Sequence, residues 1–396
     1  MLTGSSVRAL ISLALLSSCC SWVSRAEAYS WMLRHEYAQC MPCHVEPSGG
    51  GALSRYGRGI GQSLLPTQYG KTGEETGQAE LLWNSVPLPE PLLVSGDVRL
   101  LQMIRKIENV ERDERFILMQ ADAEATVQLE RFVTSASIGY AHEGALAAAI
   151  TREPERNLVS RQHWLGFWLA PSALLVRAGR MNLPYGIRNI EHTLWARALT
   201  RTSVDDDQQH GLALALSSEH FRGELMGIAG NFQLRPDDFR ERGYSGYLEW
   251  SPASRFAVGA SSSITHRELD TRLLRKTWRH AHGIFARWAT PWQPLVLLTE
   301  WNYALTSPQR SERQEGAVGY LQADTEVTQG IHLIATGEAH SVGIDRPPVS
   351  YSAWLSYAWF FAPQADFRLD GIYQSLGSDL GRSDAFLLLM QAHMYL

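Results

Sequence analysis

The chain has 396 residues and a formal net charge of −5 at pH 7. A net charge this small argues against nucleic acid as a partner, and the length allows either two or three domains or one large all-β barrel. The 13 Trp and 14 Tyr residues favour a protein at the boundary between an apolar and an aqueous phase, because indole and phenol rings have an apolar body and a polar tip.

The first 28 residues have the features of an export signal. Arg8 gives a positive start, apolar or small residues follow from 9 to 23, and Ala26-Glu27-Ala28 forms an A-x-A-like cleavage site. Cleavage there starts the mature chain at Tyr29. One alternative is a membrane anchor, but the apolar run is too short for a spanning helix. A second alternative is a lipoprotein cleavage box ending at Cys19.

Residues 40 to 44 carry the chemistry of the chain. They read Cys40-Met41-Pro42-Cys43-His44, the C-x-x-C-H attachment signature of c-type haem. Two thiols at this spacing can reach the two vinyl groups of one porphyrin as thioethers, and His44 is then held under the ring. We therefore predict one covalent haem c, bound by Cys40 and Cys43, with His44 as the proximal ligand of the haem iron. Export fits, because haem c is attached outside the cytoplasm.

Three other kinds of site use closely spaced cysteines. A zinc ribbon needs a second ligand pair, and removal of the signal with Cys19 and Cys20 leaves only Cys40 and Cys43. A thioredoxin-like site needs a βαβ context, whereas this neighbourhood is rich in Gly and Pro. A plain disulfide between Cys40 and Cys43 stays open as an alternative in an oxidising compartment.

The distal ligand of the iron is less visible in the sequence. Met32, His35 and Met41 are the nearest candidates, and Met41 lies inside the attachment loop, poorly placed to reach the opposite face of a haem. We take His35 as the predicted distal ligand. The histidines after residue 100 are expected to line the pore or to lie in loops.

Residues 29–91 offer little material for a core of their own. After the motif the chain continues with Pro47-Ser48-Gly49-Gly50-Gly51 and Tyr56-Gly57-Arg58-Gly59, and it stays rich in Gly, Pro and polar residues up to Pro91. We predict that 29–91 forms a monohaem cytochrome c-like plug and linker. Its support would come from the haem and from the inside of a wide barrel.

From Leu92 onward, apolar and polar residues alternate with a period of two, which is typical of strands with one apolar and one polar face. The clearest examples are 117–129, 331–340 and 366–373. We predict an all-β domain over 92–396, a 16-stranded antiparallel transmembrane β-barrel. Its predicted strands are 92–104, 115–128, 132–142, 159–170, 173–181, 209–218, 220–230, 243–251, 255–265, 278–290, 293–305, 313–326, 329–341, 348–362, 364–376 and 383–396.

The connections between these strands alternate between short and long. Short ones such as Pro171-Ser172 and Ala362-Pro363 carry turn residues, while long ones include 143–158, 182–208 and 231–242. Outer-membrane barrels have short periplasmic turns and long outside loops. An even number of strands then places the N- and C-termini of the barrel in the periplasm.

A sheet in lipid must close, because every backbone N–H and C=O has to be paired within the protein. Its apolar face then meets lipid and its polar face lines the lumen, here with Asp97, Arg99, Asp122, Glu124, Glu338 and Arg368. Aromatic clusters are expected to form girdles at the two interfaces, namely Trp301 with Tyr303, and Trp354 with Tyr357, Trp359 and Phe360. The alternative is a soluble sandwich or propeller, but no blade-length repeat is visible.

An export signal, one C-x-x-C-H near the mature start, a Gly-rich stretch after it and a sixteen-strand porin together resemble the fused outer-membrane cytochrome–porin family, as found in iron-oxidising bacteria. Gly179-Arg180-Met181-Asn182-Leu183-Pro184-Tyr185-Gly186 also resembles a strand-to-loop turn of bacterial porins. The resemblance implies that the haem plugs the barrel. Electrons from an extracellular donor, ferrous iron in the studied members, would pass to a periplasmic carrier such as a cytochrome c or a cupredoxin.

Three functions therefore compete. The chain is an electron conduit or iron(II)-oxidising cytochrome, a diffusion porin in which the cysteine pair is incidental, or a haem-bearing sensor or anchor that does not conduct. Single-electron transfer needs no general base or nucleophile, so a catalytic triad is not expected. Asp205-Asp206-Asp207 could attract a metal cation, but a solvated loop is the expected reading.

Overall fold

The structure is a computed structural model. It describes residues 30–67, 86–108, 112–140, 158–189, 191, 193–204, 207–271, 273–292, 294–342, 349–378 and 381–395. The predicted signal over 1–28 lies outside the described residues. Among the helices that are described, none has the length and apolar character needed to cross a bilayer.

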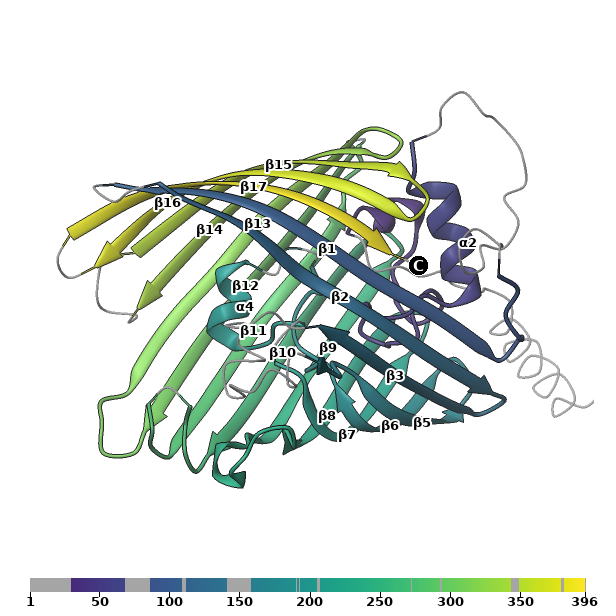
Figure 1. Ribbon diagram of the computed structural model, residues 1–396, viewed down its shortest axis with the longest axis horizontal. Helices are drawn as coiled ribbons and strands as arrows, with labels where there is room; N and C mark the ends of the chain where they lie inside the picture. Colours follow the sequence, from purple (N-terminus) through teal and green to yellow (C-terminus); the bar gives the residue numbers. More distant parts are fainter. Residues whose placement is uncertain are drawn as a thin grey trace, which may run out of the picture.

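Sixteen antiparallel strands close into a barrel (Figure 1). β17 pairs with β1 and completes the ring, while the two-residue β4 and the longer β5 both pair with β3 and together make one interrupted strand. The predicted sixteen-strand barrel is confirmed, with boundaries that differ by a few residues. The strands are β1 Leu92–Ile107, β2 Asp113–Leu129, β3 Phe132–Tyr140, β4 Leu158–Val159, β5 His163–Ala170, β6 Leu174–Met181, β7 Gln209–Ser217, β8 Phe221–Gly230, β9 Arg242–Ala253, β10 Phe256–Arg267, β11 Thr277–Ala289, β12 Leu295–Pro308, β13 Gln314–Thr328, β14 Ile331–Val342, β15 Val349–Ala362, β16 Ala365–Ser378 and β17 Gly381–Tyr395.

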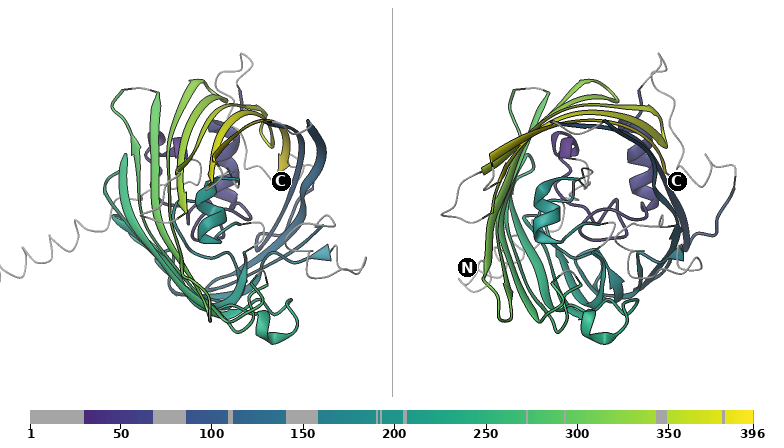
Figure 2. Two further views of the ribbon diagram at one scale, coloured as in Figure 1. Left: turned by 90° about the vertical axis from the view of Figure 1, so that its left-hand side faces the viewer. Right: turned by 60° about the vertical axis from the view of Figure 1, so that its left-hand side comes forward.

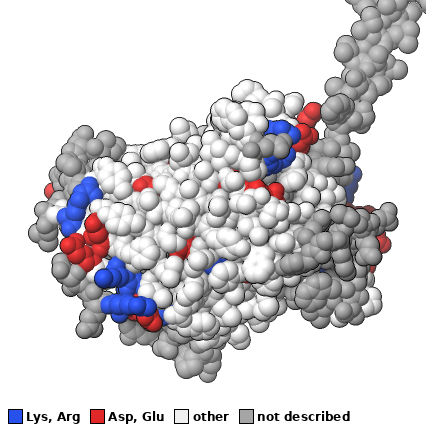
Figure 3. Space-filling view, turned by 90° about the horizontal axis from the view of Figure 1, so that it is seen from above, with Lys and Arg blue, Asp and Glu red and all other residues white. Residues whose placement is uncertain are grey.

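The two faces of the wall have opposite polarity. On β14 the inward side chains of His332, Thr336 and Glu338 are buried, while the outward Leu333 is 45 % exposed. The outer surface in Figure 3 is mainly uncharged, with charges gathered toward its two ends. This is the reverse of a soluble sandwich and is what a barrel in lipid requires. All six predicted lumen residues lie on the inner side, where they line cavities or are buried.

The predicted aromatic girdle is partly wrong. Trp301 faces outward and is 53 % exposed, as predicted, but Trp354 and Phe360 are buried. They share the inward positions of β15 with Ser352 and Ser356, and the Trp354 indole N–H donates to Glu338 Oε2 over 3.0 Å. An indole whose N–H is hydrogen-bonded to a lumen carboxylate can face inward without leaving a buried donor unpaired.

The strict alternation expected over 117–129 breaks at Met119. The pairing of β1 with β2 shifts register between Arg99 and Leu100, opposite Gln120 and Leu118, so Met119 is an extra residue in the ladder. Beyond such a bulge the side chains change faces. Ile117 and Met119 consequently pack against the buried cluster inside the barrel, where the alternation predicts a lipid-facing position.

Short turns lie at one end of the barrel and long connections at the other, as predicted. The connection 182–208 differs, because the parts of it that the structure describes fold into the lumen instead of remaining outside. Its helix α4 (Trp195–Thr200) lies inside the ring (Figure 2), and Leu194 and Ala196 are fully buried. The Trp195 N–H donates to Glu338 Oε1 over 2.7 Å, and the Arg197 guanidinium pairs with Glu300 on β12.

The N-terminal segment 30–67 also lies within the ring (Figure 2). It contains the 3₁₀ helix η1 (Ser30–His35) and the helix α2 (Arg55–Leu64). Trp31, Met32 and Leu33 are buried in one cluster with wall residues that include Val296 and Tyr320. The described part of the segment thus packs its apolar side chains against the barrel.

One turn brings the barrel wall into contact with the N-terminal segment. Gly330, between β13 and β14, has φ +79°, and a Cβ there would lie 2.5 Å from the Thr67 backbone N. We expect Gly330→Ala to lower the free energy of unfolding by about 1–3 kcal/mol, because the left-handed backbone and the close approach both disfavour a side chain. The measurement is urea unfolding of the detergent-folded barrel.

Gly337→Ala is the matched control, since a Cβ at Gly337 on β14 meets nothing within 4 Å. It should leave the unfolding midpoint unchanged. Equal midpoints for the two variants would contradict the role assigned to Gly330.

Candidate functional site

The predicted haem motif forms a tight turn between η1 and α2. The backbone N–H groups of Cys43 and His44 both donate to the Cys40 carbonyl, over 3.2 and 3.0 Å. The chain then folds back, so that the Val45 N–H donates to the Ala52 carbonyl. Cys40 and Cys43 are buried and are not joined in a disulfide. Neither thiol of the motif is therefore consumed by a disulfide.

His44 is oriented by the glycine run that follows it. Its Nδ1 lies 3.1 Å from the Gly50 carbonyl oxygen and 3.2 Å from the Gly50 backbone nitrogen, and Gly50 has φ +101°. Contact of Nδ1 with the backbone leaves Nε2 as the nitrogen for a metal. Burial lowers the pKa of His44 to about 4, against smaller opposing effects of Gly50 and Glu46. The imidazole is thus neutral near pH 7, the form that binds a metal.

A cavity of about 240 Å³ lies beside Cys43 and His44. On one side it is lined by the N-terminal segment, including Gly57 and Gly61 of α2, and on the other by β1, β2 and β17. A Cβ at Gly57 would lie 2.2 Å from the Cys43 carbonyl oxygen, so only glycine lets α2 pack this closely on the motif. Ser54 caps α2 by accepting the Gly57 N–H, and its hydroxyl donates to the Pro42 carbonyl.

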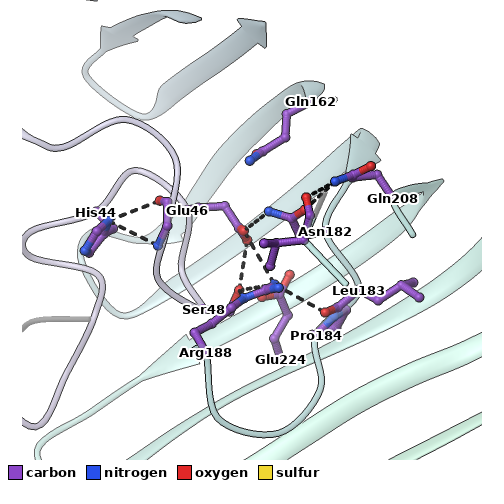
Figure 4. A network of polar contacts seen from close by, with 12 residues as sticks. His44, Glu46, Ser48, Gln162, Asn182, Leu183, Pro184, Arg188, Gln208 and Glu224 are labelled. Carbon is purple, nitrogen blue, oxygen red and sulfur yellow. Dashed lines mark hydrogen bonds and ion pairs between the residues drawn. The ribbon is translucent and has the colours of Figure 1, made fainter. Parts of the chain in front are cut away.

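A buried polar network fixes this loop to the barrel (Figure 4). Glu46 accepts from Arg177 on β6 over 3.0 Å and from Asn182 over 2.9 Å. Burial opposes the ionisation of Glu46, but Arg177 and Arg188 outweigh it and hold the pKa of Glu46 below its ordinary value. Arg188 also donates to the Ser48 hydroxyl over 2.8 Å. Arg177 of the wall and Asn182 and Arg188 of the inward connection therefore all bind the loop that orients His44.

Cys40 is held from the other side. The Arg222 guanidinium donates to Cys40 Sγ over 2.6 Å and pairs with Glu249, and Arg287 donates to the Ala38 carbonyl over 3.0 Å. The structure thus brings Cys43 and His44 to the cavity and places the Cys40 thiol against the wall next to it.

The donor set fits a haem c. It comprises two thiols at the attachment spacing that are not joined in a disulfide, and a neutral imidazole whose Nδ1 is fixed by the backbone, all within one turn. The adjoining cavity has a volume of about 240 Å³ and is lined in part by the barrel wall. Three arginines line this cavity, Arg99, Arg161 and Arg188, and so do three carboxylates, those of Asp97, Asp122 and Glu124. The arginines are the cations that two haem propionates could meet there, in competition with these acids.

The other predicted ligands lie elsewhere. His35 lies at the end of η1, with its ring centroid 5.1 Å from that of Trp31. Met32 is buried in the same apolar cluster, and Met41 packs against a second cluster. None of the three lines the cavity beside His44, so His35 stays a prediction. Asp207 accepts from the Ser203 N–H, while Asp205 and Asp206 lie outside the described residues.

Sequence reasoning did not identify the wall residues of the cavity as parts of a site. His393 and Tyr395 on β17 line it together with Asp97 and Arg99 on β1. The alternating pattern placed Asp97 and Arg99 in the lumen, but no local motif links them to His44. Only the register of the closed sheet could have done so.

Comparison with known proteins establishes the fold. No family model and no curated protein matches the chain. Among solved structures, OmpT of Vibrio cholerae is 10 % identical with a TM-score of 0.57, covering 79 % of this chain and 100 % of its own. An anion-selective porin from Comamonas acidovorans is 9 % identical, with a TM-score of 0.57 and coverage of 77 % and 99 %. OmpF of Salmonella typhi in complex with daunomycin is 11 % identical, with a TM-score of 0.57 and coverage of 76 % and 97 %. At these identities the likeness shows that this chain has the fold of outer-membrane porins.

The packing of α2 on the motif can be tested with two glycines of one helix. Gly57→Ala should push α2 away from Cys43 and make residues 55–64 more sensitive to protease. Gly59→Ala is the control, because a Cβ there meets nothing within 4 Å and alanine favours a helix over glycine by about 1 kcal/mol. Equal cleavage rates in the two variants would show that the contact at Gly57 is unimportant.

The ionic anchor of the loop is testable at Glu46. Glu46→Gln removes the negative charge that faces Arg177 and Arg188, and we expect a loss of about 1–3 kcal/mol in the free energy of unfolding. Arg177 keeps its second partner, Glu224, which limits the loss. The measurement is chemical denaturation in detergent. Glu219→Gln, on a side chain 65 % exposed, should have no effect, and a Glu46 variant as stable as this control would refute the anchor.

Proposed function

We propose that this chain is an electron conduit of a bacterial outer membrane. One haem c, held by Cys40 and Cys43 as thioethers and by His44 as the proximal ligand, would carry electrons between an extracellular partner and a periplasmic carrier. The observation that carries the proposal is the C-x-x-C-H turn inside a porin barrel. Its two cysteines are not joined in a disulfide, its imidazole is oriented by Gly50, and a cavity lies beside Cys43 and His44.

A bound haem c would supply one Fe(III)/Fe(II) couple inside the lumen, with a potential set by ligands, burial and nearby charge. The chain supplies the rest. Gly50 fixes the His44 ring, and Glu46 with Arg177 fixes the loop that carries it. Arg99, Arg161 and Arg188 offer cations to the propionates, while the carboxylates of Asp97, Asp122 and Glu124 line the same cavity and balance the charge of the three arginines.

The position of the site suits transfer across a membrane. An apolar band about 25 Å tall cannot carry electrons by itself, whereas a redox centre in the lumen shortens the gap from both sides. The described lumen holds both the N-terminal segment and the connection 182–204 with α4. These two segments oppose the free diffusion of solutes through the lumen. They do not hinder electron transfer, which needs only close approach of donor and acceptor.

We place the short turns and both ends of the barrel in the periplasm, following the rule that long loops lie outside. The N-terminal segment then enters the barrel from the periplasmic side. A small oxidised cytochrome c or a cupredoxin would take up the electron there, and ferrous iron is the first donor to test.

A diffusion porin is the second candidate, and the likeness to porins of known structure favours it. A haem-bearing anchor that does not conduct is the third. Covalent haem separates the conduit and the anchor from the porin, and transfer across a membrane separates the conduit from the anchor.

The test uses the full-length protein, matured in a host that attaches haem c and purified in detergent. We expect a haem c absorption spectrum and one covalent haem per chain by pyridine haemochrome assay. Cys43→Ala and His44→Ala should lose most of this haem, while Met41→Ala, within the same loop, should keep it. In liposomes with an impermeant acceptor inside, Fe(II) outside should reduce that acceptor only when the haem is present.

A colourless wild-type protein that forms ion-conducting pores in planar bilayers would overturn the conduit and establish the porin. A haem protein that takes electrons from Fe(II) without passing them to the enclosed acceptor would instead support the anchor.

A further inference from the structure

We infer that His393, on the last strand of the barrel, is the distal axial ligand of the haem. This inference rests on the proposed function, because it assumes that a haem c is bound at Cys40, Cys43 and His44. It joins the two ends of the chain in one metal site, with one axial imidazole from the N-terminal segment and the other from the barrel wall.

The first argument is the set of donors around the cavity. Among the described residues that line it besides His44, the imidazole and phenol side chains are those of His393 and Tyr395, and no methionine belongs to the lining. His44 lies on the segment side of the cavity and His393 on the wall side. The predicted ligand His35 lies by Trp31 and does not line this cavity.

The second argument is how the His393 ring is held. Its Nδ1 lies 2.8 Å from Asp366 Oδ2 on β16, and its Nε2 lies 3.1 Å from Asp97 Oδ1 on β1. A carboxylate on one ring nitrogen is the usual support of a metal-bound histidine, because it fixes the tautomer and strengthens the other nitrogen as a donor. Asp366 fills that role, and Asp97 occupies the nitrogen that would turn to the iron.

Release of Nε2 by Asp97 is inexpensive because Asp97 has a second partner. The Arg99 Nε donates to the same oxygen, Asp97 Oδ1, over 3.1 Å, so the carboxylate keeps a charge-assisted hydrogen bond when the imidazole turns away. The His393 side chain is 8 % exposed, and a buried imidazole needs a partner on each nitrogen. Iron would replace Asp97 as the partner of Nε2.

Tyr395 is the weaker donor. A phenol binds ferric iron as the phenolate, and a phenolate is disfavoured by nearby carboxylates. Tyr395 is the register partner of Asp97 across the seam between β17 and β1, so its oxygen would have to ionise beside that carboxylate. A neutral imidazole adds no negative charge beside Asp97.

The experiment compares the ferric spectra of the matured wild-type protein with those of four histidine variants and one aspartate variant, by visible absorption and electron paramagnetic resonance. The wild type should be six-coordinate and low-spin with two nitrogen ligands. His393→Ala should keep its covalent haem, lose the low-spin signal and bind carbon monoxide rapidly when reduced. Added imidazole should restore the low-spin state, and His393→Met should give a distinct His–Met signature.

His332→Ala is the matched control. His332 is equally buried on the inner wall and its Nδ1 also meets a carboxylate, that of Asp324 over 2.9 Å, but it does not line the cavity. This variant should stay low-spin. Asp366→Asn, at the residue that positions His393, should stay low-spin but shift the midpoint potential upward, since a less basic imidazole stabilises the oxidised iron less.

Each outcome has one meaning. A wild type with haem that is high-spin, or a His393→Ala protein that stays low-spin, overturns the inference while the proposed function stands. If His35→Ala loses the low-spin signal instead, the distal ligand is His35. A wild type without haem defeats the proposed function itself. Gel mobility with and without heating confirms that each variant has a folded barrel.

Discussion

The structure depends on one constraint, the need to pair every backbone polar group inside a sheet that faces lipid. The pairing of β17 with β1 meets it by closing the ring. The lipid then requires the inverted polarity of the wall, with side chains such as Leu333 and Trp301 outside and charged groups such as Glu338 and Arg368 within. Packing a polypeptide into such a lumen is costly unless the lumen charges are neutralised wherever water is excluded.

The two segments inside the lumen are the N-terminal segment and the connection with α4. They neutralise the lumen charges with ion pairs instead of a large apolar core. Glu46 enters between Arg177 and Arg188, Arg197 of α4 meets Glu300, and Arg368 meets Glu191 at 2.8 Å. Buried pairs of this kind add little net stability, but breaking one is costly, since it leaves an unpaired charge. They therefore fix the position of the loop that bears His44 more than they strengthen the barrel.

Local sequence patterns predict the parts of this protein that depend on neighbours along the chain. Period-two alternation locates the strands within a few residues, and five consecutive residues define the C-x-x-C-H turn. The patterns fail where a distant contact decides. The sequence predicts Trp354 as an interfacial aromatic, because its contact with Glu338 is not visible in the local pattern. The bulge at Met119 likewise depends on the register of β1 against β2. The connection 182–208 has the length and polarity of an outside loop, and only the complementary acids Glu300 and Glu338 on the wall explain why it turns inward.

The same distinction separates the two halves of the candidate metal site. Cys40, Cys43 and His44 are set by spacing, and Gly50 lies close enough in sequence for local folding to orient the ring. The wall side of the site depends on the pairing of the first and last strands. His393 comes opposite Arg99 on β1 only when β17 pairs with β1, and Asp366 on β16 is its neighbour on the other side. A haem attached to the unfolded N-terminal segment would then find its distal side completed only by a closed barrel. Closure, which the lipid imposes on the sheet, would in this way also finish the coordination of the iron and couple assembly of the barrel to the redox properties of its contents.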